Sequence, residues 1–403
     1  MRKLALEDDI EELSELGEEK EVRKPKFRHN RLNLGEHFEM CHATNGFQSR
    51  YHMTSNAFER LVGLLDITVN EDRSRASTQG NDPICSRMIV AMGLRFMGGE
   101  KKKSLADIFG CSISSVDRIV DIFLNAVDLC SHVDLSVDLL PTEYNEQVRM
   151  AIDWNEKSGA LGIYYGCIGA IDGWLCTMEK PADVINPTDY HSGHYQRFGM
   201  NVQAMCDVNL RFIYLSVCAS GGTGDARAFR KLHGLNAWLD GLREGFYIIG
   251  DCAYELTNKL LIPFSGARRL DEANDNYNFF LSQLRIRIEM TFGRLTTKWR
   301  IFRSDLLAAN GTARNCLIIR VGAKLHNYVI NIDNPNLKSV PVDDFESLEI
   351  EPLEDGPEGN LGFLPIVSDV NDISRLSINA EDRRTLIVDT LREYPELKRP
   401  SRD

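Results

Sequence analysis

The chain has 403 residues and an ordinary globular composition, with 43% hydrophobic residues, 26% charged residues and a formal net charge of -12. These values exclude a collagen-like chain, a chain disordered throughout and a small disulfide-stapled fold. No apolar run reaches the roughly 18 residues needed to cross a bilayer, and the acidic start lacks the apolar core of a signal peptide. We therefore expect a soluble, non-secreted protein of two or three domains.

The charge is segregated along the chain. Residues 1–22 carry 9 acidic and 3 basic side chains, a net charge of -6. Residues 331–403 carry 17 acidic and 8 basic side chains, a net charge of -9. The remaining residues, 23–330, therefore have a net charge of +3. Within that middle part, residues 285–303 contain six Lys or Arg and a single acid, Glu289. Acidic ends often serve solubility alone, whereas a basic stripe around one carboxylate suggests contact with phosphate.

The ten cysteines are scattered and form no C-x-x-C pair. Several lie inside apolar runs such as YYGCIGAI. This pattern is typical of reduced, buried cysteines in an intracellular protein rather than of disulfides or zinc ligands.

Residues 1–50 are predicted to be a charged N-terminal segment. Its cluster RKPKFRHNR, at 23–31, places five basic residues in nine positions and is either a nuclear import signal or a solvated linker. From 51 to 150 the apolar residues recur at spacings of three and four, which predicts a helical region.

Residues 104–127 of that region fit a helix-turn-helix. Two interpretations stay open: a recognition helix that enters a DNA groove, and a plain helical hairpin that packs on its neighbours. Ala106, Gly110, Val116 and Ile119 take the small, turn and apolar positions, with Ser114, Ser115, Asp117 and Arg118 on the outward face.

Residues 160–332 change to a mixed α/β pattern. Three extended segments, GCIGAIDGWLCTM, NVQAMCD and RFIYLSVCAS, are followed by a helix at 225–239, the apolar strand FYIIGD and further helices. Residues 333–403 are rich in Pro, Asp, Glu and Gly, which predicts an acidic C-terminal tail with one weak helix within 371–394.

Two aspartates lie in or directly after the predicted strands. Asp172 interrupts the apolar segment CIGAIDGW, where an unpaired carboxylate costs several kcal/mol. Asp251 ends the strand FYIIGD, at the edge where ligands of open α/β sheets gather. Both positions suggest a functional role.

Glu289 belongs to a long predicted helix. One residue after the apolar Ile288, it is rotated by about 100° and lies at the border of the apolar stripe, where it can lean into the sheet. The alternative is an ion pair with Arg285, four residues earlier, worth a few tenths of a kcal/mol. The stripe consists of Leu281, Leu284, Ile288, Phe292, Leu295 and Trp299.

Together, three carboxylates from two strands and one helix are the ligands that two Mg²⁺ or Mn²⁺ ions about 4 Å apart need for attack on a phosphodiester. We therefore predict Asp172, Asp251 and Glu289 as catalytic and metal-binding residues. The basic residues near Glu289 would hold the nucleic-acid backbone. They are Arg285, Arg287, Arg294, Lys298 and Arg300.

Five sequence blocks in order resemble the DDE domain of PIF/Harbinger-type transposases and of the domesticated nucleases derived from them. The resemblance covers 165–330 closely, and 51–130 resembles the region that precedes that domain. The blocks are CIGAIDGW, YHSGHYQRFGMNVQAMCD, GGTGDARAF, IIGDCAYELTNKLLIPFSG and FFLSQLRIRIEMTFGRLTTKWRIF.

The resemblance implies an RNase H-like mixed sheet flanked by helices, with Asp172, Asp251 and Glu289 as the acidic triad. It also implies a divalent metal, cleavage of double-stranded DNA at transposon ends, strand transfer, action in the nucleus and often a separate Myb-like DNA-binding partner. Trp174 and Leu175 depart from the Thr and His that many members have after the first aspartate. A homo-oligomer is a further expectation.

Two alternatives accompany this interpretation. The chain could be a domesticated, non-catalytic DNA-binding or adaptor protein, or a nuclease acting on RNA or hybrids. His191 and His194 are interpreted as a loop pair rather than as zinc ligands. Asp225 is interpreted as a helix N-cap and Asp207 as a hairpin-turn residue.

Overall fold

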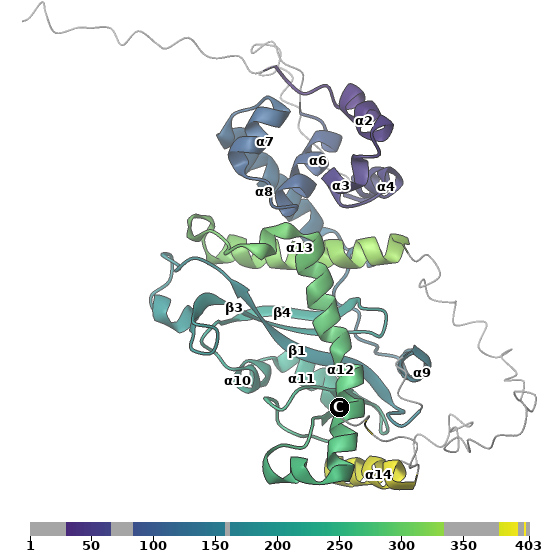
Figure 1. Ribbon diagram of the computed structural model, residues 1–403. Coiled ribbons are helices and arrows are strands. Elements are labelled where there is room, and N and C mark those ends of the chain that lie inside the picture. The colour runs from purple at the N-terminus through teal and green to yellow at the C-terminus, as the bar shows by residue number, and fades with distance from the viewer. Residues whose placement is uncertain (1–29, 66–83, 158–161, 334–378, 394–398, 400–403) are drawn as a thin grey trace, which may run out of the picture.

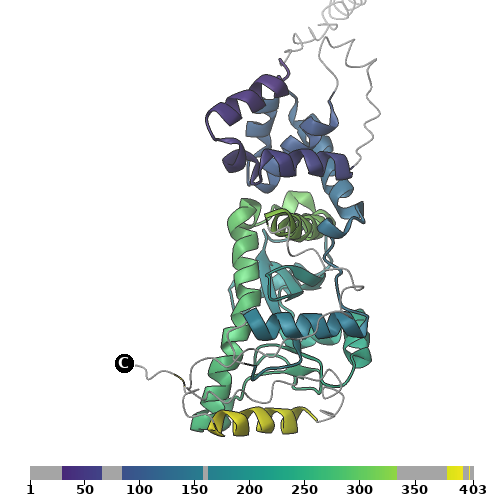
Figure 2. The same cartoon turned by 90° about the vertical axis from the view of Figure 1, so that its right-hand side faces the viewer.

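The computed structural model describes residues 30–65, 84–157, 162–333, 379–393 and 399. It is a mixed α/β protein with a helical region at one end and a sheet in the middle (Figures 1 and 2). In this part of the chain, no helix is long and apolar enough to cross a membrane. The acidic start, most of the basic cluster and most of the C-terminal tail lie outside the described residues.

The helical region begins earlier than the sequence pattern indicated, at Leu34. Aromatic rings hold its first helices together, with Phe38 packed edge-on against Phe47 and Phe58 at centroid distances of 5.3 Å each. Aromatic pairs of this geometry add to the burial of apolar surface. The helices are α2 (Leu34–Ala43), α3 (Phe47–Tyr51), α4 (Ser55–Leu65), α6 (Ser86–Met97), α7 (Lys102–Phe109) and α8 (Ile113–Leu129).

Helices α7 and α8 form the predicted hairpin. Gly110 between them has a φ of 62°, and a Cβ there would lie 1.8 Å from the carbonyl oxygen of Asn30, so only glycine fits. Ser112 caps α8 by accepting a hydrogen bond from the Ser115 amide at 3.1 Å. Ala106, Val116 and Ile119 are buried as predicted.

The outward face of α8 is partly covered by α13 (Thr312–Asp333). Arg314 of α13 lies 3.5 Å from Asp117 and 2.9 Å from Asp121. Further along, Arg320 binds Asp128 at 2.7 Å, and Lys324 donates to three carbonyls at the end of α8, including Val127 at 3.1 Å. These contacts favour the packed hairpin over a free recognition helix.

The three predicted extended segments form the centre of the sheet. β1 pairs antiparallel with β3, and β3 with β4, while β5 and β6 continue the sheet in parallel on the other side of β1. The short β2 pairs with the start of β3. The strands are β1 (Cys167–Thr177), β2 (His191–Ser192), β3 (Arg197–Cys206), β4 (Phe212–Ser220), β5 (Tyr247–Ile249) and β6 (Leu260–Leu261).

Helices cover both faces of this sheet (Figure 1). α9 (Tyr144–Lys157) and α11 (His233–Gly241) bury one face in a cluster with Ile168 and Ile171 of β1. α12 (Glu272–Lys298) and α13 cover the other face, toward which Cys167 and Ala170 point. The register of β1 shifts between Cys167 and Ala170, so residues three apart in this segment share a face.

The helix predicted at 225–239 is divided into α10 (Asp225–Arg230) and α11. The break falls at Lys231 and Leu232, and the Leu232 side chain turns inward and is buried. Tertiary packing at this residue therefore overrides the continuous helical spacing. The short 3₁₀ turns are η1 (Val133–Leu135), η2 (Pro187–Tyr190), η3 (Gly266–Leu270), η4 (Arg300–Arg303) and η5 (Ala308–Asn310).

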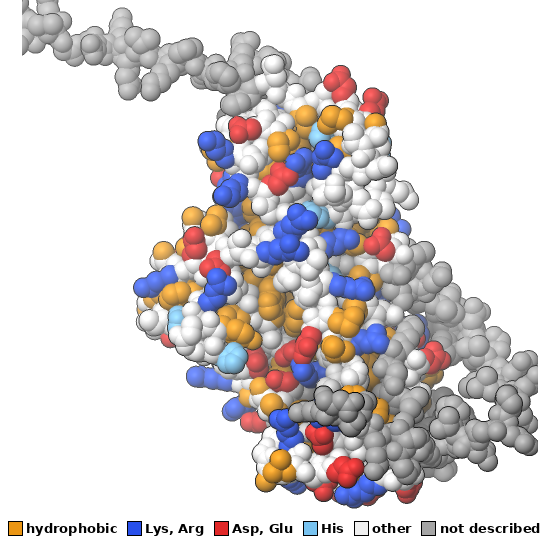
Figure 3. All heavy atoms as spheres, viewed as in Figure 1, with side chains coloured by type: hydrophobic (Ala, Val, Ile, Leu, Met, Phe, Trp, Pro, Cys, Tyr) orange, Lys and Arg blue, Asp and Glu red, His pale blue; other side chains and the backbone are white. Residues whose placement is uncertain are grey.

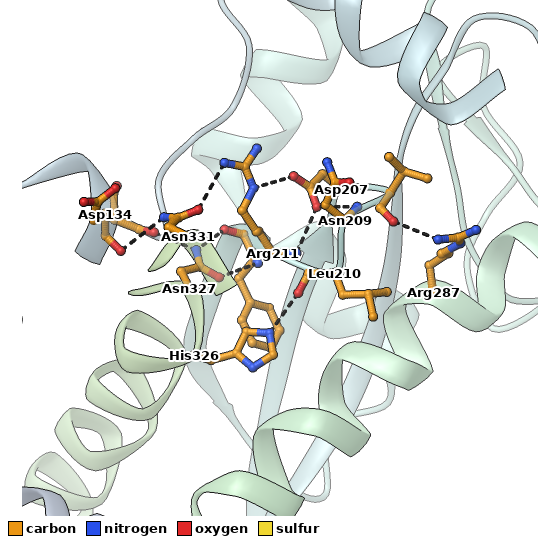
Figure 4. Close-up of polar contacts among 12 residues, drawn as sticks. Asp134, Asp207, Asn209, Leu210, Arg211, Arg287, His326, Asn327 and Asn331 are labelled. Carbon is orange, nitrogen blue, oxygen red and sulfur yellow. Dashed lines mark hydrogen bonds and ion pairs between the residues drawn. The ribbon is translucent and has the colours of Figure 1, made fainter. Parts of the chain in front are cut away.

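A polar network fixes the β3–β4 turn against α13 (Figure 4). Asp207 accepts hydrogen bonds from the Asn209 and Arg211 amides at 2.9 Å each, which confirms it as a turn residue. Buried Asn327 of α13 accepts from the Phe212 amide at 2.8 Å and donates to the Phe212 carbonyl at 2.7 Å. The strand end is thus tied to the helix that also contacts α8.

The described part of the C-terminal tail contains α14 (Ala380–Glu393), which packs beside α12 at the far end from the helical region (Figure 2). Arg383 donates to the Gly245 carbonyl at 2.8 Å, and Arg384 lies over the Phe264 ring at 3.6 Å. Cation–π contact and burial of the arginine stems stabilise this helix on the domain.

The cysteines whose side chains are described are free thiols. Cys252, directly after Asp251, is exposed. The buried ones, as expected from their apolar surroundings, are Cys41, Cys111, Cys167, Cys176 and Cys206.

Candidate active site

The two predicted aspartates lie just beyond the point where the pairing of β1 with β5 ends. The parallel pairing of these strands runs only to Ala170 opposite Ile249, while β1 continues past it. Asp172 lies two residues beyond that pair, and Asp251 follows β5 by two residues. Both carboxylates therefore reach the carboxyl edge of the parallel strands, where open sheets bind their ligands.

Asp172 is largely withdrawn from solvent, with 16% of its side chain exposed. Its Oδ1 accepts a hydrogen bond from the Gly173 amide at 2.8 Å, and its Oδ2 lies 3.3 Å from Nη1 of Arg285. The pKa of Asp172 is raised to about 7, mainly by burial and also by the carboxylates of Asp251 and Asp225, against the opposing effects of the Gly173 amide and Arg285. Burial and the neighbouring carboxylates therefore disfavour the ionised form of Asp172.

Asp251 has a similar environment. Its Oδ1 accepts a hydrogen bond from the Ala253 amide at 2.8 Å. Burial raises the pKa of Asp251, with further contributions from Asp225 and Glu289, while the Ala253 amide and Arg285 lower it. Four acidic side chains therefore influence one another at this edge.

Arg285 connects Glu289 to the strand edge. Its Nη1 lies 2.6 Å from Oε1 of Glu289 and 3.3 Å from Oδ2 of Asp172. The intrahelical ion pair considered as an alternative is present, and the same guanidinium also reaches the strand. Glu289 itself is 48% exposed, at the border of the buried stripe where the helical phase put it.

The stripe of α12 is buried as predicted, and it docks the helix beside Asp172. Trp174, two residues after Asp172 and on the same side of β1, has its ring centroid 5.6 Å from those of both Phe292 and Phe302. Trp174 therefore packs α12 against the strand that carries Asp172.

The predicted basic residues do not share one face of α12. At 100° per residue, Arg287, Arg294 and Lys298 lie roughly 180–220° around the helix from Arg285. Arg287 donates to the Val208 carbonyl at 2.9 Å, at the β3–β4 turn (Figure 4). The predicted basic stripe is therefore divided: Arg285 lies on the side of α12 that contacts the carboxylates, and Arg287, Arg294 and Lys298 lie on the other side.

The second basic group lies toward the helical region. Burial lowers the pKa of Lys298, as does nearby Arg294. Arg300 follows in η4, and burial lowers the pKa of His52 to about 4, with Arg300 and Lys298 contributing. Figure 3 shows Lys and Arg side chains gathered where α12 approaches the helical region, and acidic side chains lower on the same face.

The donor set fits a divalent cation chemically, since carboxylate oxygens are the ligands that Mg²⁺ and Mn²⁺ prefer. In the described part of the chain, however, no three His, Cys, Asp or Glu side chains lie close enough to hold a metal ion together. The guanidinium of Arg285 is the cation between Asp172 and Glu289. Shared ligation of a metal therefore requires Arg285 to move.

Asp225 is not the helix cap that the sequence suggested. The N-cap of α10 is Gly224, and no side chain caps that end. The Oδ1 of Asp225 instead accepts hydrogen bonds from Asn201 at 2.8 Å and Gln203 at 2.9 Å. The sequence does contain a sign of this contact: Asn201 and Gln203 are two amides on one face of the otherwise largely apolar strand β3, where a polar partner is expected.

Residues 171–327 match the family model described as DDE superfamily endonuclease. The matched segment includes Asp172, Asp225, Asp251 and Glu289. It runs from the middle of β1 into α13, so it spans the sheet edge where these carboxylates lie. The comparisons with curated proteins and with solved structures found no match.

Proposed function

We propose that this protein is a divalent-metal-dependent DNA endonuclease of the DDE transposase type, related to PIF/Harbinger transposases. The observation that carries the proposal is that the endonuclease match contains Asp172, Asp251 and Glu289, and that Arg285 and the shared electrostatics link these three residues at one sheet edge. A mixed sheet flanked by helices supports an RNase H-like assignment of the fold.

In this proposal the chain's own residues arrange the reactants. Asp172, within β1, and Asp251, just after β5, hold and orient the attacking water or 3′-hydroxyl, and Glu289 completes the ligand set from α12. A bound Mg²⁺ or Mn²⁺ would supply Lewis-acid activation and neutralise charge on the phosphate. Arg285, released from the carboxylates, is then placed to contact the phosphate group.

The proposed substrate is double-stranded DNA at transposon ends, with strand joining as a second step. Arg294 and Arg300 are exposed and support a path for the DNA backbone from the carboxylates toward the helical region. Arg287 and Lys298, on the same side of α12 as Arg294, belong to this proposed path. Nuclear action, a Myb-like partner protein and a homo-oligomer complete the proposal.

The direct test is cleavage of duplex DNA by Asp172→Asn and Asp251→Asn proteins. Both substitutions are expected to abolish Mn²⁺-dependent cleavage while the circular dichroism spectrum stays that of the unchanged protein. A parallel RNA–DNA hybrid substrate separates a DNA endonuclease from a hybrid nuclease. Cleavage that persists in either variant would remove the proposed site from the reaction.

A second candidate is a domesticated, non-catalytic DNA-binding or adaptor protein. It is favoured by the position of Arg285, whose single positive charge already contacts both Asp172 and Glu289 without a metal. Melting with and without Mn²⁺ distinguishes the two functions, because a ligand that binds the folded state raises stability by mass action. A nuclease is expected to melt at a higher temperature with Mn²⁺, and an adaptor at the same temperature.

A further inference from the structure

Gly293 lies in the interior of the long helix α12 and is exposed. Among the described residues, a Cβ built on it would meet no atom within 4 Å. Glycines inside two other helices are explained by packing, because a Cβ on Gly93 of α6 would lie 2.1 Å from the Phe123 ring and one on Gly322 of α13 2.5 Å from the Phe302 ring. Glycine is less favourable than alanine in a helix interior, since it loses more backbone freedom on folding. Packing within the described chain therefore does not explain Gly293.

The surface around Gly293 continues the edge of the candidate active site. Glu289 lies one turn earlier on the same face, because four residues correspond to a rotation of only about 40°. The carboxylate of Glu289 contacts the guanidinium of Arg285 at 2.6 Å, and that guanidinium also reaches Asp172. A molecule in contact with Gly293 would therefore lie one helical turn from Glu289 and its bound guanidinium.

A second guanidinium lies on the other side of Gly293 along the helix. Arg303, which is exposed, donates to the carbonyl of Thr296 at 3.3 Å and to that of Thr297 at 3.2 Å. Around the helix these two threonines lie about 60° to one side of Gly293 and about 40° to the other. The exposed glycine thus lies between positive charges in both directions along α12.

The segment that follows Glu289 carries charge of one sign. Residues 290–304 contain Arg294, Lys298, Arg300 and Arg303 and no acidic residue. Figure 3 shows uncharged surface on this part of the molecule between Lys and Arg side chains toward the helical region and acidic side chains lower down. A polyanion is the complementary partner, because its phosphates can pair with the cations while its backbone passes over the uncharged surface.

We infer that Gly293 is the point where the sugar–phosphate backbone of DNA passes closest to α12, and that the missing side chain lets that backbone lie near the guanidinium groups of Arg285 and Arg303. A larger side chain at this position would hold the strand away from the helix. A contact made only to the backbone carries no sequence preference. This inference rests on the proposed function, since it concerns the path of the same substrate.

The test is binding of a fluorescein-labelled DNA duplex to the full chain in EDTA, measured by fluorescence anisotropy on the unchanged protein and on Gly293→Gln. The dissociation constant of Gly293→Gln is expected to rise roughly tenfold for duplexes of different sequence alike, and the slope of its logarithm against the logarithm of the salt concentration is expected to fall by about one. Glutamine adds no charge and is a better helix former than glycine, so the melting temperature should not fall.

Gly63→Gln is the matched control. Gly63 is also exposed, in the last turn of α4, and within the described part of the chain a Cβ there likewise meets no atom within 4 Å. The same side chain is therefore added to an exposed helix position away from α12. The DNA affinity of Gly63→Gln should equal that of the unchanged protein.

The outcomes separate the inference from the function on which it rests. If the unchanged protein binds the duplex and Gly293→Gln binds it equally well, the inference is overturned and the proposed function stands. If the unchanged protein binds no duplex, the DNA-directed function fails and the inference fails with it. An equal loss of affinity in Gly63→Gln would also overturn the inference. Should Gly293→Gln melt at a lower temperature, Gly293→Ala must combine a higher melting temperature with weaker DNA binding for the inference to hold.

Discussion

Replacing Asp172 with asparagine should stabilise the protein at alkaline pH, although it removes a proposed catalytic group. Burial raises the pKa of Asp172 from 3.8 to about 7, with Asp251 and Asp225 adding to the effect. One pH unit of difference between the folded and unfolded pKa corresponds to about 1.36 kcal/mol. The difference of about three pH units is therefore worth at most about 4 kcal/mol of unfolding free energy.

The direction follows from proton binding. Between pH 4 and 7 the folded protein keeps the proton on Asp172 while the unfolded chain has lost it, so unfolding releases a proton and stability falls as the pH rises. The stability that the raised pKa of Asp172 contributes is fully present below a pH of about 4 and is lost above a pH of about 7. Asparagine does not ionise, so the free energy of unfolding of Asp172→Asn should not fall in this way as the pH rises from 4 to 7.

Urea denaturation in EDTA at several pH values between 4 and 8.5 measures the effect. Asp172→Asn should have a higher unfolding free energy than the unchanged protein at pH 8 by a few kcal/mol, and the two should converge toward pH 4. Asp240→Asn, which removes a carboxylate from an exposed position on α11, serves as the control. A difference between the two proteins that is the same at every pH would refute the reasoning.

Three further substitutions test neighbouring contacts. Arg285→Gln removes the cation between two carboxylates and should lower stability by about 1 kcal/mol at pH 8 but less at pH 5, where the Asp172 side chain is protonated. Gly173→Ala places a Cβ 2.0 Å from Oδ1 of Asp225 and should lower stability by about 1–3 kcal/mol, measured by thermal melting. Asn327→Ala leaves the Phe212 amide and carbonyl unpaired in the core and should cost about 3 kcal/mol in urea denaturation.

Each of these substitutions has an outcome that would contradict its basis. For Arg285→Gln it is a stability loss independent of pH, and for Gly173→Ala it is unchanged melting. An Asn327→Ala protein as stable as the unchanged chain would show that the network of Figure 4 does not anchor the β3–β4 turn.

Much of the sheet and of α12 could be predicted from the sequence because side-chain periodicity reports local burial. The extended segments at Asp172 and Asp251 and the apolar stripe around Ile288 all occur where the pattern placed them. The border position of Glu289 followed from one step of helical rotation.

The rest depended on partners distant in the chain. Asp225 was interpreted as a cap because its neighbours in sequence suit one, whereas its actual partners are Asn201 and Gln203, on a strand about 20 residues earlier. The basic residues of α12 were grouped by proximity in sequence, but Arg287 and Arg285 lie on different sides of the helix. Local patterns do not encode such pairings.

The contact between α8 and α13 bears on how the molecule can be divided. Lys324 of α13 binds the last carbonyls of α8, and Arg320 binds Asp128 just before that end. A fragment cut to the endonuclease match would keep Lys324 but lose every one of those acceptors. The excised fragment would therefore expose a surface shaped for the missing helix, and its behaviour would not represent that of the whole chain.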